Sequence, residues 1–250
     1  MKRTTAITIG LILVFAGSAF GNTAYIKYAS PGEYCGVAGF SVDFDNNGTW
    51  DEVYNNNVYT GEYKFRFDPD SPFSSPEAKL LLDDPFYAYC IDVDQNAPSQ
   101  WTVYTLEDLE NAPNNSWGIG IDTPRANRIR ELFGRFFTGV DTREEGEAFA
   151  ACLWEIVFEQ SGTDNLAAGT LVMNGLDWNA EAVATGWLGQ LNGDTDYFDM
   201  HVFALTNDTY QDFALTSPGW GGQPPPIPEP VTMVGLVLGA VGLVRYIRKR

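Results

Sequence analysis

The sequence predicts an α+β domain, in which a strand-rich scaffold of sandwich or barrel type carries an insertion of about three helices. Three observations favour this fold class. Residues 36–105 are rich in β-branched and aromatic side chains, and turn-forming residues interrupt them. Residues 123–192 change to the 3.6-residue period of helices. Residues 199–216 return to two short strand-like runs.

The first predicted strand spans residues 36–45 and alternates apolar and polar side chains from Phe40 onward. It leads into Asn46-Asn47-Gly48, and an Asn-Gly pair favours a tight hairpin turn. We therefore expect the first two strands to form a β-hairpin. The further strand-like runs are WDEVY, GEYKFRFD, FYAYCIDV, WTVYT, DMHVFALT and TYQDFALT.

Three segments have the pattern of helices. The first, DTPRANRIRELFGRFF, offers Thr123 as an N-cap and Pro124 as the first helical residue. Thr142 and Glu145 have the spacing of a capping box and open the second segment, EEGEAFAACLWEIVFE. This second helix is apolar nearly all round, so we expect it to be buried on most faces. The third and shortest segment is NAEAVATGWLGQLN.

The N-terminal residues 1–21 have the layout of a secretory signal peptide. Lys2 and Arg3 precede an apolar core at residues 7–16, and a small-x-small cleavage site follows at residues 19–21. Removal of this segment leaves a mature domain at residues 22–222, which is long enough for one sizeable core.

The C-terminal end has a different pattern. A proline-rich linker at residues 223–230 precedes residues 231–250, an apolar run followed by basic residues. The run reaches the lower limit of the ~20 residues that a membrane helix needs only when its flanking apolar residues are included. The basic residues, which the positive-inside rule keeps on the cytoplasmic side, are Arg245, Arg248, Lys249 and Arg250. An ordinary tail anchor has the same layout.

The charge of the chain limits its partners. The sequence holds 33 acidic and 15 basic residues, a formal net charge of −18. Six of the basic residues belong to the two ends, so nine remain against 33 acids, a net charge of −24. Such a surface repels nucleic acid, which we exclude as a partner, and favours divalent cations.

The three-residue motif Pro228-Glu229-Pro230, followed by a short apolar helix and an arginine cluster, resembles the PEP-CTERM sorting signal of bacteria that make extracellular polysaccharide. The resemblance implies a Gram-negative bacterium and an exosortase partner at the inner membrane. It also implies transient anchoring by the C-terminal helix, then a cell-surface or extracellular location, in contact with extracellular polysaccharide or biofilm.

The cysteine and histidine content excludes several enzyme classes. Cys35, Cys90 and Cys152 permit one disulfide and leave one thiol over, and His201 is the only histidine. The sequence contains no CxxC, HExxH or GxSxG motif. A histidine-based triad or a multi-histidine zinc site is therefore excluded, and we predict no catalytic residue.

The segments YAYCIDVDQ and AFAACLWEIVFE resemble, in their order, the motifs of bacterial surface thioester domains. The resemblance implies that Cys90 matches the cysteine that attacks a glutamine side chain. Four residues before Trp154, however, the glutamine position holds Ala150, so we expect an unreactive relative. A shifted alignment would give the role to Gln95 or Gln160. In a third interpretation, Cys90 is a small buried apolar residue.

A calcium-loop spacing occurs in the first predicted hairpin. Asp43, Asp45, Asn47 and Asp51 match the oxygen-ligand positions of an EF-hand loop, whereas Tyr54 stands where its closing glutamate would be. These residues are a candidate Ca²⁺ site. The alternative is a solvated hairpin turn.

Five of the nine mature basic residues lie in or just after the first predicted helix. They are Arg125, Arg128, Arg130, Arg135 and Arg143. They suggest either a docking patch for an anionic polysaccharide or, as we prefer, ion pairs with the acidic domain.

Together these patterns predict an exported, exosortase-sorted structural or adhesive protein of the cell surface or matrix, without enzymatic activity. One alternative is a covalent adhesin with an internal thioester at Cys90. Another is a polysaccharide hydrolase, although no carboxylate pair, such as Glu155 and Glu159, is marked out by its context.

Overall fold

The computed structural model describes residues 22–217, except residues 46, 94, 114–117, 161–163 and 198–199. The predicted signal peptide, the proline-rich linker, the PEP motif and the basic C-terminal cluster all lie outside the described residues. Within the described part of the chain, no helix has the length and apolar character needed to cross a membrane.

The strands form one antiparallel sheet in the order β2-β3-β7-β6-β4-β1-β5. Their bounds are β1 (Thr23–Val42), β2 (Glu52–Phe67), β3 (Phe86–Cys90), β4 (Thr102–Glu107), β5 (Leu171–Asn174), β6 (Val202–Thr206) and β7 (Phe213–Thr216). Because β1 pairs with β4 at its start and with β2 along most of its length, the sheet closes on itself. This arrangement confirms the predicted α+β class with a barrel-like scaffold.

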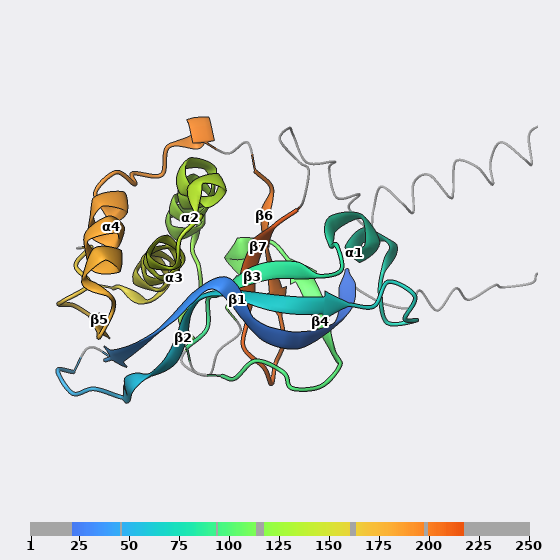
Figure 1. The fold of residues 1–250 in the computed structure, drawn as a ribbon, viewed down its shortest axis with the longest axis horizontal. Helices are drawn as coiled ribbons and strands as arrows, with labels where there is room; N and C mark the ends of the chain where they lie inside the picture. Colours follow the sequence, from blue (N-terminus) through green and yellow to red (C-terminus); the bar gives the residue numbers. More distant parts are fainter. Residues whose placement is uncertain are drawn as a thin grey trace, which may run out of the picture.

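Helices α2, α3 and α4 gather at one end of this scaffold, with the long β1–β2 ribbon extending beneath them, whereas α1 lies at the other end (Figure 1). They are α1 (Pro76–Leu81), α2 (Thr123–Phe136), α3 (Arg143–Phe158) and α4 (Trp178–Leu188), with short 3₁₀ turns η1 (Leu109–Asn111), η2 (Phe137–Gly139) and η3 (Thr195–Tyr197). Helices α2, α3 and α4 are the three predicted from the sequence, whereas α1 was not predicted.

Helix α3 is the centre of the core. The predicted capping box of Thr142 and Glu145 is present at its start. Every residue from Gly146 to Phe158 is buried, which confirms the expectation from its all-round apolar composition. The helix contacts β1, β2 and β3 on one side and α2 and α4 on the other. It therefore joins the sheet to the helical layer.

The first turn of α2 differs from the prediction. Asp122, and not Thr123, is the N-cap, because the Asp122 carboxylate accepts a hydrogen bond from the main-chain N–H of Arg125. Asp is as good an N-cap as any residue and better than Thr. The helix therefore takes Thr123 as its first residue.

The hairpin between β1 and β2 also differs from the prediction. Strand β1 begins at Thr23, well before the predicted start, and ends at Val42, which pairs with Glu52. The connection is thus a loop at residues 43–51 and not a tight Asn-Gly turn. The loop is held by carboxylates that accept main-chain N–H groups, which a two-residue turn does not need.

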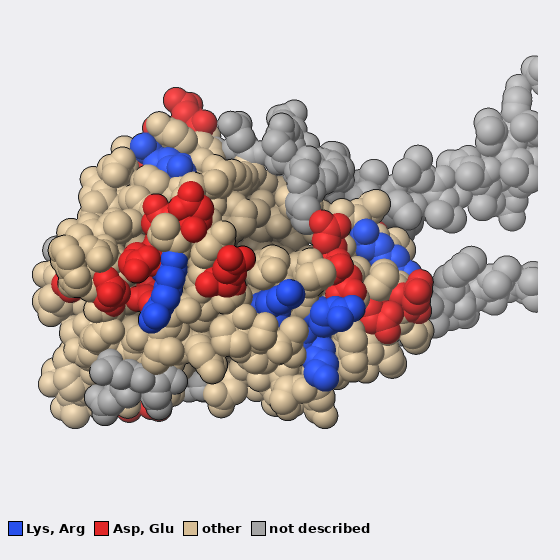
Figure 2. Space-filling view, viewed as in Figure 1, with Lys and Arg blue, Asp and Glu red and all other residues tan. Residues whose placement is uncertain are grey.

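The arginines of α2 and its exit are engaged in pairs. The ion pairs are Arg128–Asp164, Arg130–Glu110, Arg135–Glu131 and Arg143–Glu147. Arg125 donates to the main-chain oxygens of Gly120 and Glu159. Basic and acidic side chains also lie side by side on the face seen in Figure 2. The ion-pair interpretation of this cluster is therefore confirmed.

Buried glutamates of α2 and α3 hold the loops of the helical layer by accepting main-chain N–H groups. Glu131 accepts from the main-chain N–H groups of residues 192–194, in the loop that follows α4, with N···O distances of 2.8, 2.7 and 3.1 Å. Glu159 accepts from Thr170, and Glu155 accepts from Asn165 at 2.7 Å. Among the described residues, the second carboxylate oxygen of Glu155 has no hydrogen-bond partner.

We predict that Glu155 makes stability fall as pH rises. Burial, and after it the neighbouring Glu159 and Asp164, raise the pKa of Glu155 from 4.5 to about 8 in the folded protein. Its contribution is complete below the unfolded pKa and is lost as pH rises through the folded one, by up to ~1.4 kcal/mol for each pH unit. Glu155→Gln keeps an oxygen for Asn165 and removes the charge. Urea unfolding at pH 6 and pH 9 should therefore show a smaller difference in the variant than in the wild type, and an equal difference would contradict the assignment.

Candidate functional site

Cys90 is the last residue of β3, and its side chain is buried. Its thiol donates a hydrogen bond to the main-chain oxygen of Asp92, with an S···O distance of 2.9 Å. The indole Nε1–H of Trp154 donates to the main-chain oxygen of Cys90, also at 2.9 Å. The two predicted motifs, YAYCIDVDQ and AFAACLWEIVFE, are thus in direct contact through Cys90 and Trp154.

The pairing of β3 with β7 brings Gln211 to the same place. Cys90 is the partner of Phe213 in this antiparallel ladder. The ladder ends at this pair, and the main-chain N–H of Ile91 then donates to the main-chain oxygen of Asp212, the residue next to Gln211. The side-chain amide Nε2 of Gln211 donates to the Asp92 main-chain oxygen at 2.9 Å.

The thiol of Cys90 and the amide of Gln211 therefore share one acceptor. Because both lie 2.9 Å from the same oxygen, Sγ and Nε2 are separated by no more than twice that distance. Gln211 is 6% exposed, and its main chain is fixed by a hydrogen bond to Asn96 and another from the Tyr104 hydroxyl. The structure brings together a nucleophile and an acyl group, both buried and held in place.

Burial determines the protonation state of the thiol. It raises the pKa of Cys90 far above that of an ordinary cysteine, and the negative charge of Asp92 raises it further. The thiol is therefore neutral at physiological pH, and it acts as a hydrogen-bond donor to the Asp92 carbonyl. A neutral buried thiol resists reaction with external oxidants and alkylating agents.

Gln211 was not among the residues that the sequence singled out. Ala150 is buried on α3 and has no amide, and its place as the acceptor position stays a prediction. Gln160 donates its side-chain amide to the Phe44 main-chain oxygen at 3.2 Å. The available signal for Gln211 was its place in the strand-like run TYQDFALT, where it stands between Tyr210 and Asp212.

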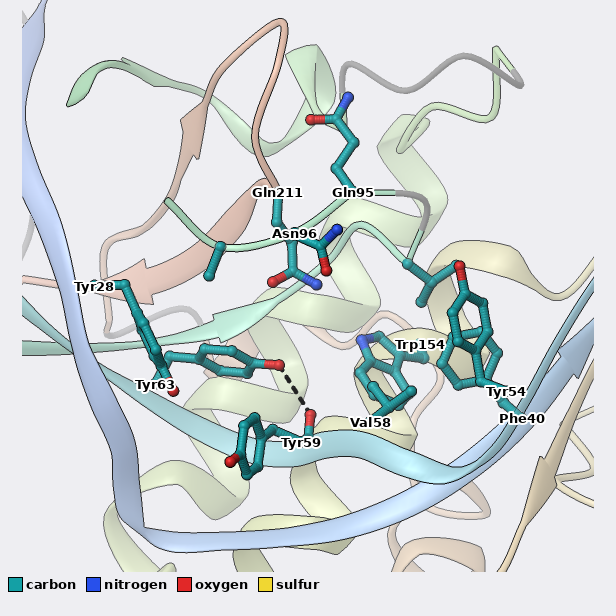
Figure 3. Close-up of a pocket in the computed structure, with 12 residues that line it drawn as sticks. Tyr28, Phe40, Tyr54, Val58, Tyr59, Tyr63, Gln95, Asn96, Trp154 and Gln211 are labelled. Atoms are coloured by element: carbon teal, nitrogen blue, oxygen red, sulfur yellow. Dashed lines mark hydrogen bonds between the residues drawn. The ribbon is translucent and has the colours of Figure 1, made fainter. Parts of the chain in front are cut away.

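A cavity of about 390 Å³ opens beside Gln211 and Trp154. Figure 3 shows Tyr54, Phe40 and Trp154 on one side of it, and Tyr28, Tyr59 and Tyr63 on the other. The carboxamides of Asn96 and Gln211 lie between these two groups, whereas that of Gln95 points away from the aromatic side chains. The cavity gives a small molecule a route to the Gln211 amide.

The other two cysteines are separate from this site. Cys35, Cys90 and Cys152 are all free thiols, so the disulfide that the sequence permitted is absent. The Cys152 thiol donates to the Ala184 main-chain oxygen inside the helical layer. Burial, then the charges of Glu147 and Glu62, raise the pKa of Cys35 to about 12.

The candidate calcium residues lie in the loop between β1 and β2. The carboxylate oxygens of Asp43, Asp45 and Asp51 lie within 4.8 Å of one another. The side-chain amide of Asn47 donates to Asp45 at 2.8 Å, so its oxygen faces away from that carboxylate. Three of the four predicted ligands therefore converge, and Asn47 would have to rotate to join them.

We predict weak Ca²⁺ binding at these three carboxylates, with a Kd of ~10⁻⁴–10⁻³ M, the range of extracellular calcium modules. Asp45→Ala should abolish the heat of Ca²⁺ binding in calorimetry, because it removes one of three converging charges. Asp70→Ala, at another exposed aspartate, is the matched control and should leave that heat unchanged. Equal heats in wild type and Asp45→Ala would exclude the site.

Comparison with solved structures found a distant structural likeness to one known domain. No protein-family model matches the chain, and no curated protein matches it. The chain is similar to a solved structure described as the N-terminal thioester domain of a surface protein from Clostridium perfringens. The identity is 11%, the TM-score is 0.39, and the match covers 71% of this chain and 97% of the other. The chemistry of the site therefore rests on the contacts of its own residues.

Proposed function

We propose that this domain forms an internal thioester between Cys90 and Gln211 and uses it to attach covalently to an amine on a partner molecule. The observation that carries the proposal is the Asp92 main-chain oxygen, which accepts hydrogen bonds from both the thiol and the amide. This shared acceptor holds the two reacting groups at one point of the fold, which is the main requirement for an intramolecular reaction.

The reaction joins the two side chains and releases ammonia. Cys90 Sγ attacks the Gln211 side-chain carbonyl carbon, and the carbon–nitrogen bond of the amide breaks. The nitrogen leaves with the proton of the thiol as ammonia, so no oxidant, metal or cofactor enters the balance. The later attack of an amine returns the thiol of Cys90 and leaves an amide bond between Gln211 and the partner.

Burial makes such a thioester long-lived. Cys90 and Gln211 are 1% and 6% exposed, so bulk water has little access to the bond. The domain would then react once with a partner that enters the cavity, as an adhesive protein does, and would not turn over as an enzyme.

The hydrolase alternative has less support. Hydrolysis of a glycosidic bond ordinarily uses two carboxyl groups on either side of the bond. None of the described side chains that line the cavity is a carboxylate. Glu155 and Glu159, the pair considered from the sequence, accept main-chain hydrogen bonds within the helical layer.

The mass of the intact protein tests the thioester. We expect the wild-type chain to be lighter by one ammonia than its sequence requires, and to gain the mass of methylamine when methylamine is added. Cys90→Ala and Gln211→Ala should each lack both changes, because each removes one of the two reacting groups. Both the ammonia loss and the methylamine adduct should be completely absent from these variants, and not merely reduced.

Gln95→Ala and Gln160→Ala are the matched controls, since they remove the two glutamines of the shifted alignments. Both should keep the ammonia loss and the methylamine adduct. A wild-type mass equal to the sequence mass, in a folded protein, would refute the thioester. If Gln160→Ala were the only glutamine variant to lose the adduct, Gln160 and not Gln211 would be the residue that forms the thioester with Cys90.

We further propose that the protein is exported and sorted through its C-terminal end, as the signal-peptide and PEP-CTERM patterns suggest. Cell fractionation should find the full chain in membranes before processing. A chain that ends at Ile227 should appear folded in the extracellular fraction, because it lacks the apolar run and the basic cluster. Membrane association of the shortened chain would contradict this role of the tail.

A further inference from the structure

The walls of the cavity differ from the rest of this acidic protein. The described side chains that line it are aromatic, aliphatic or carboxamide groups, and none of them carries a charge. Its volume of about 390 Å³ lies within the ~300–1,000 Å³ range of small-molecule sites. Its occupant is therefore selected by ring packing and neutral hydrogen bonds.

One wall is a continuous run of aromatic rings from the rim to Cys90. The half-buried Tyr54 packs on Phe40 with ring centroids 4.7 Å apart, and Phe40 packs on Trp154 at 5.3 Å. Trp154 in turn donates its indole N–H to the Cys90 main-chain oxygen. A flat apolar ring that entered along this wall would pass toward the carboxamide of Gln211, which lies beside the wall in Figure 3.

The carboxamides supply the polar side of the cavity. Asn96 has an exposed side chain that lies next to Gln211 in Figure 3, and its main-chain oxygen accepts from the Gln211 main-chain N–H. An amide offers both a donor and an acceptor, which suits a hydroxyl group. Aromatic faces beside amide groups fit a molecule with an apolar ring face and hydroxyl edges.

We propose that the amine captured at this site belongs to a hexosamine ring of a partly de-N-acetylated polysaccharide. The inference rests on the proposed thioester and adds the class of its acceptor. The ring face would pack on Tyr54, its hydroxyl groups would bind Asn96, and its amine would reach the Gln211 carbonyl carbon. A lysine side chain has no ring face to pack on Tyr54 and no hydroxyl groups to bind Asn96.

The protonation state of the amine favours the same choice. Only the unprotonated amine attacks, and an uncharged cavity offers no carboxylate to hold an ammonium ion. A lysine amine has a pKa of about 10.4, so at pH 7 it is unprotonated in less than about one molecule in a thousand. The oxygen atoms around a sugar ring make a hexosamine amine far less basic, and a larger fraction of it is ready to react.

The covalent step is balanced without a further reactant. The amine nitrogen forms a bond to the Gln211 carbonyl carbon while the bond from that carbon to Cys90 Sγ breaks. The proton released by the nitrogen returns to the sulfur. The product is an amide between Gln211 and the sugar, with Cys90 again a free thiol.

The test is the rate of adduct formation on the purified full chain, followed by intact mass. Glucosamine and Nα-acetyl-lysine methyl ester are compared at equal concentrations of unprotonated amine. Methylamine is the reference, because it is too small to pack against the aromatic wall of the cavity. We expect glucosamine to react about tenfold faster than the lysine derivative, the size of effect that a few pocket contacts give. A lysine derivative that reacts as fast or faster would overturn the inference.

Two variants locate the effect in the cavity. Tyr54→Ala and Asn96→Ala should each slow glucosamine about tenfold and leave the methylamine rate unchanged, because they remove contacts with the ring and not the reacting groups. Tyr87→Ala, which changes a 40% exposed tyrosine outside the cavity, is the matched control and should leave both rates unchanged. Equal glucosamine rates in Tyr54→Ala, Asn96→Ala and Tyr87→Ala would show that the proposed walls do not bind the sugar.

The outcomes separate this inference from the function on which it rests. If methylamine forms no adduct with the wild type, there is no thioester and the proposed function fails. If methylamine forms an adduct but glucosamine has no advantage, the thioester stands and only the choice of acceptor fails.

Discussion

The site depends on the register between β3 and β7. Cys90 pairs with Phe213, and the chain segments that follow this pair bring the Gln211 side chain to the Asp92 main-chain oxygen. A slip of one residue would turn the glutamine to the opposite face of the sheet, away from the thiol. The register is well fixed, because Phe213 packs on Phe65 with ring centroids 4.7 Å apart and β7 also pairs with β6 along its whole length. Core packing therefore holds the two reacting groups together.

Helix α3 connects this part of the sheet to the helical layer. It is buried along nearly its whole length, and its Trp154 binds the main chain of Cys90 on the sheet side. On its other side, Glu155 and Glu159 hold the loop that leads to β5. Buried carboxylates are stable only with such partners, and each one ties a loop to a helix. The helical layer is thus a rigid support behind the site.

Patterns within single segments of the sequence predicted helices α2, α3 and α4. Of the two proposed reacting residues, they predicted only Cys90. The capping box and the apolar composition of α3 lie within one segment, so the sequence was sufficient to place that helix. Cys90 and Trp154 were recognised from the order of their motifs. Strand β5 and helix α1 are four and six residues long, too short to show a period.

Gln211 could not be predicted by the same route. It lies 119 residues from Asp92 in sequence, and only the pairing of two strands brings them together. Local patterns do not encode the register between distant strands, since that register depends on how the core packs. The loop of Asp43 and Asp51 shows the same limit, because a spacing of oxygen ligands predicted the cluster but not the rotation of the Asn47 amide.

The proposed thioester would have to be closed to water and yet open to its partner, and the distribution of charge in this protein suits both needs. Acidic groups dominate the sequence, whereas the cavity lining is uncharged. The described side chains that line the cavity beside Gln211 are aromatic, aliphatic or carboxamide groups, which would exclude ions more readily than a ring with a flat apolar face. Burial, and after it the negative charge of Asp92, keep the Cys90 thiol neutral. Selection of a partner by the uncharged cavity lining would therefore be separate from protection of the proposed bond by burial.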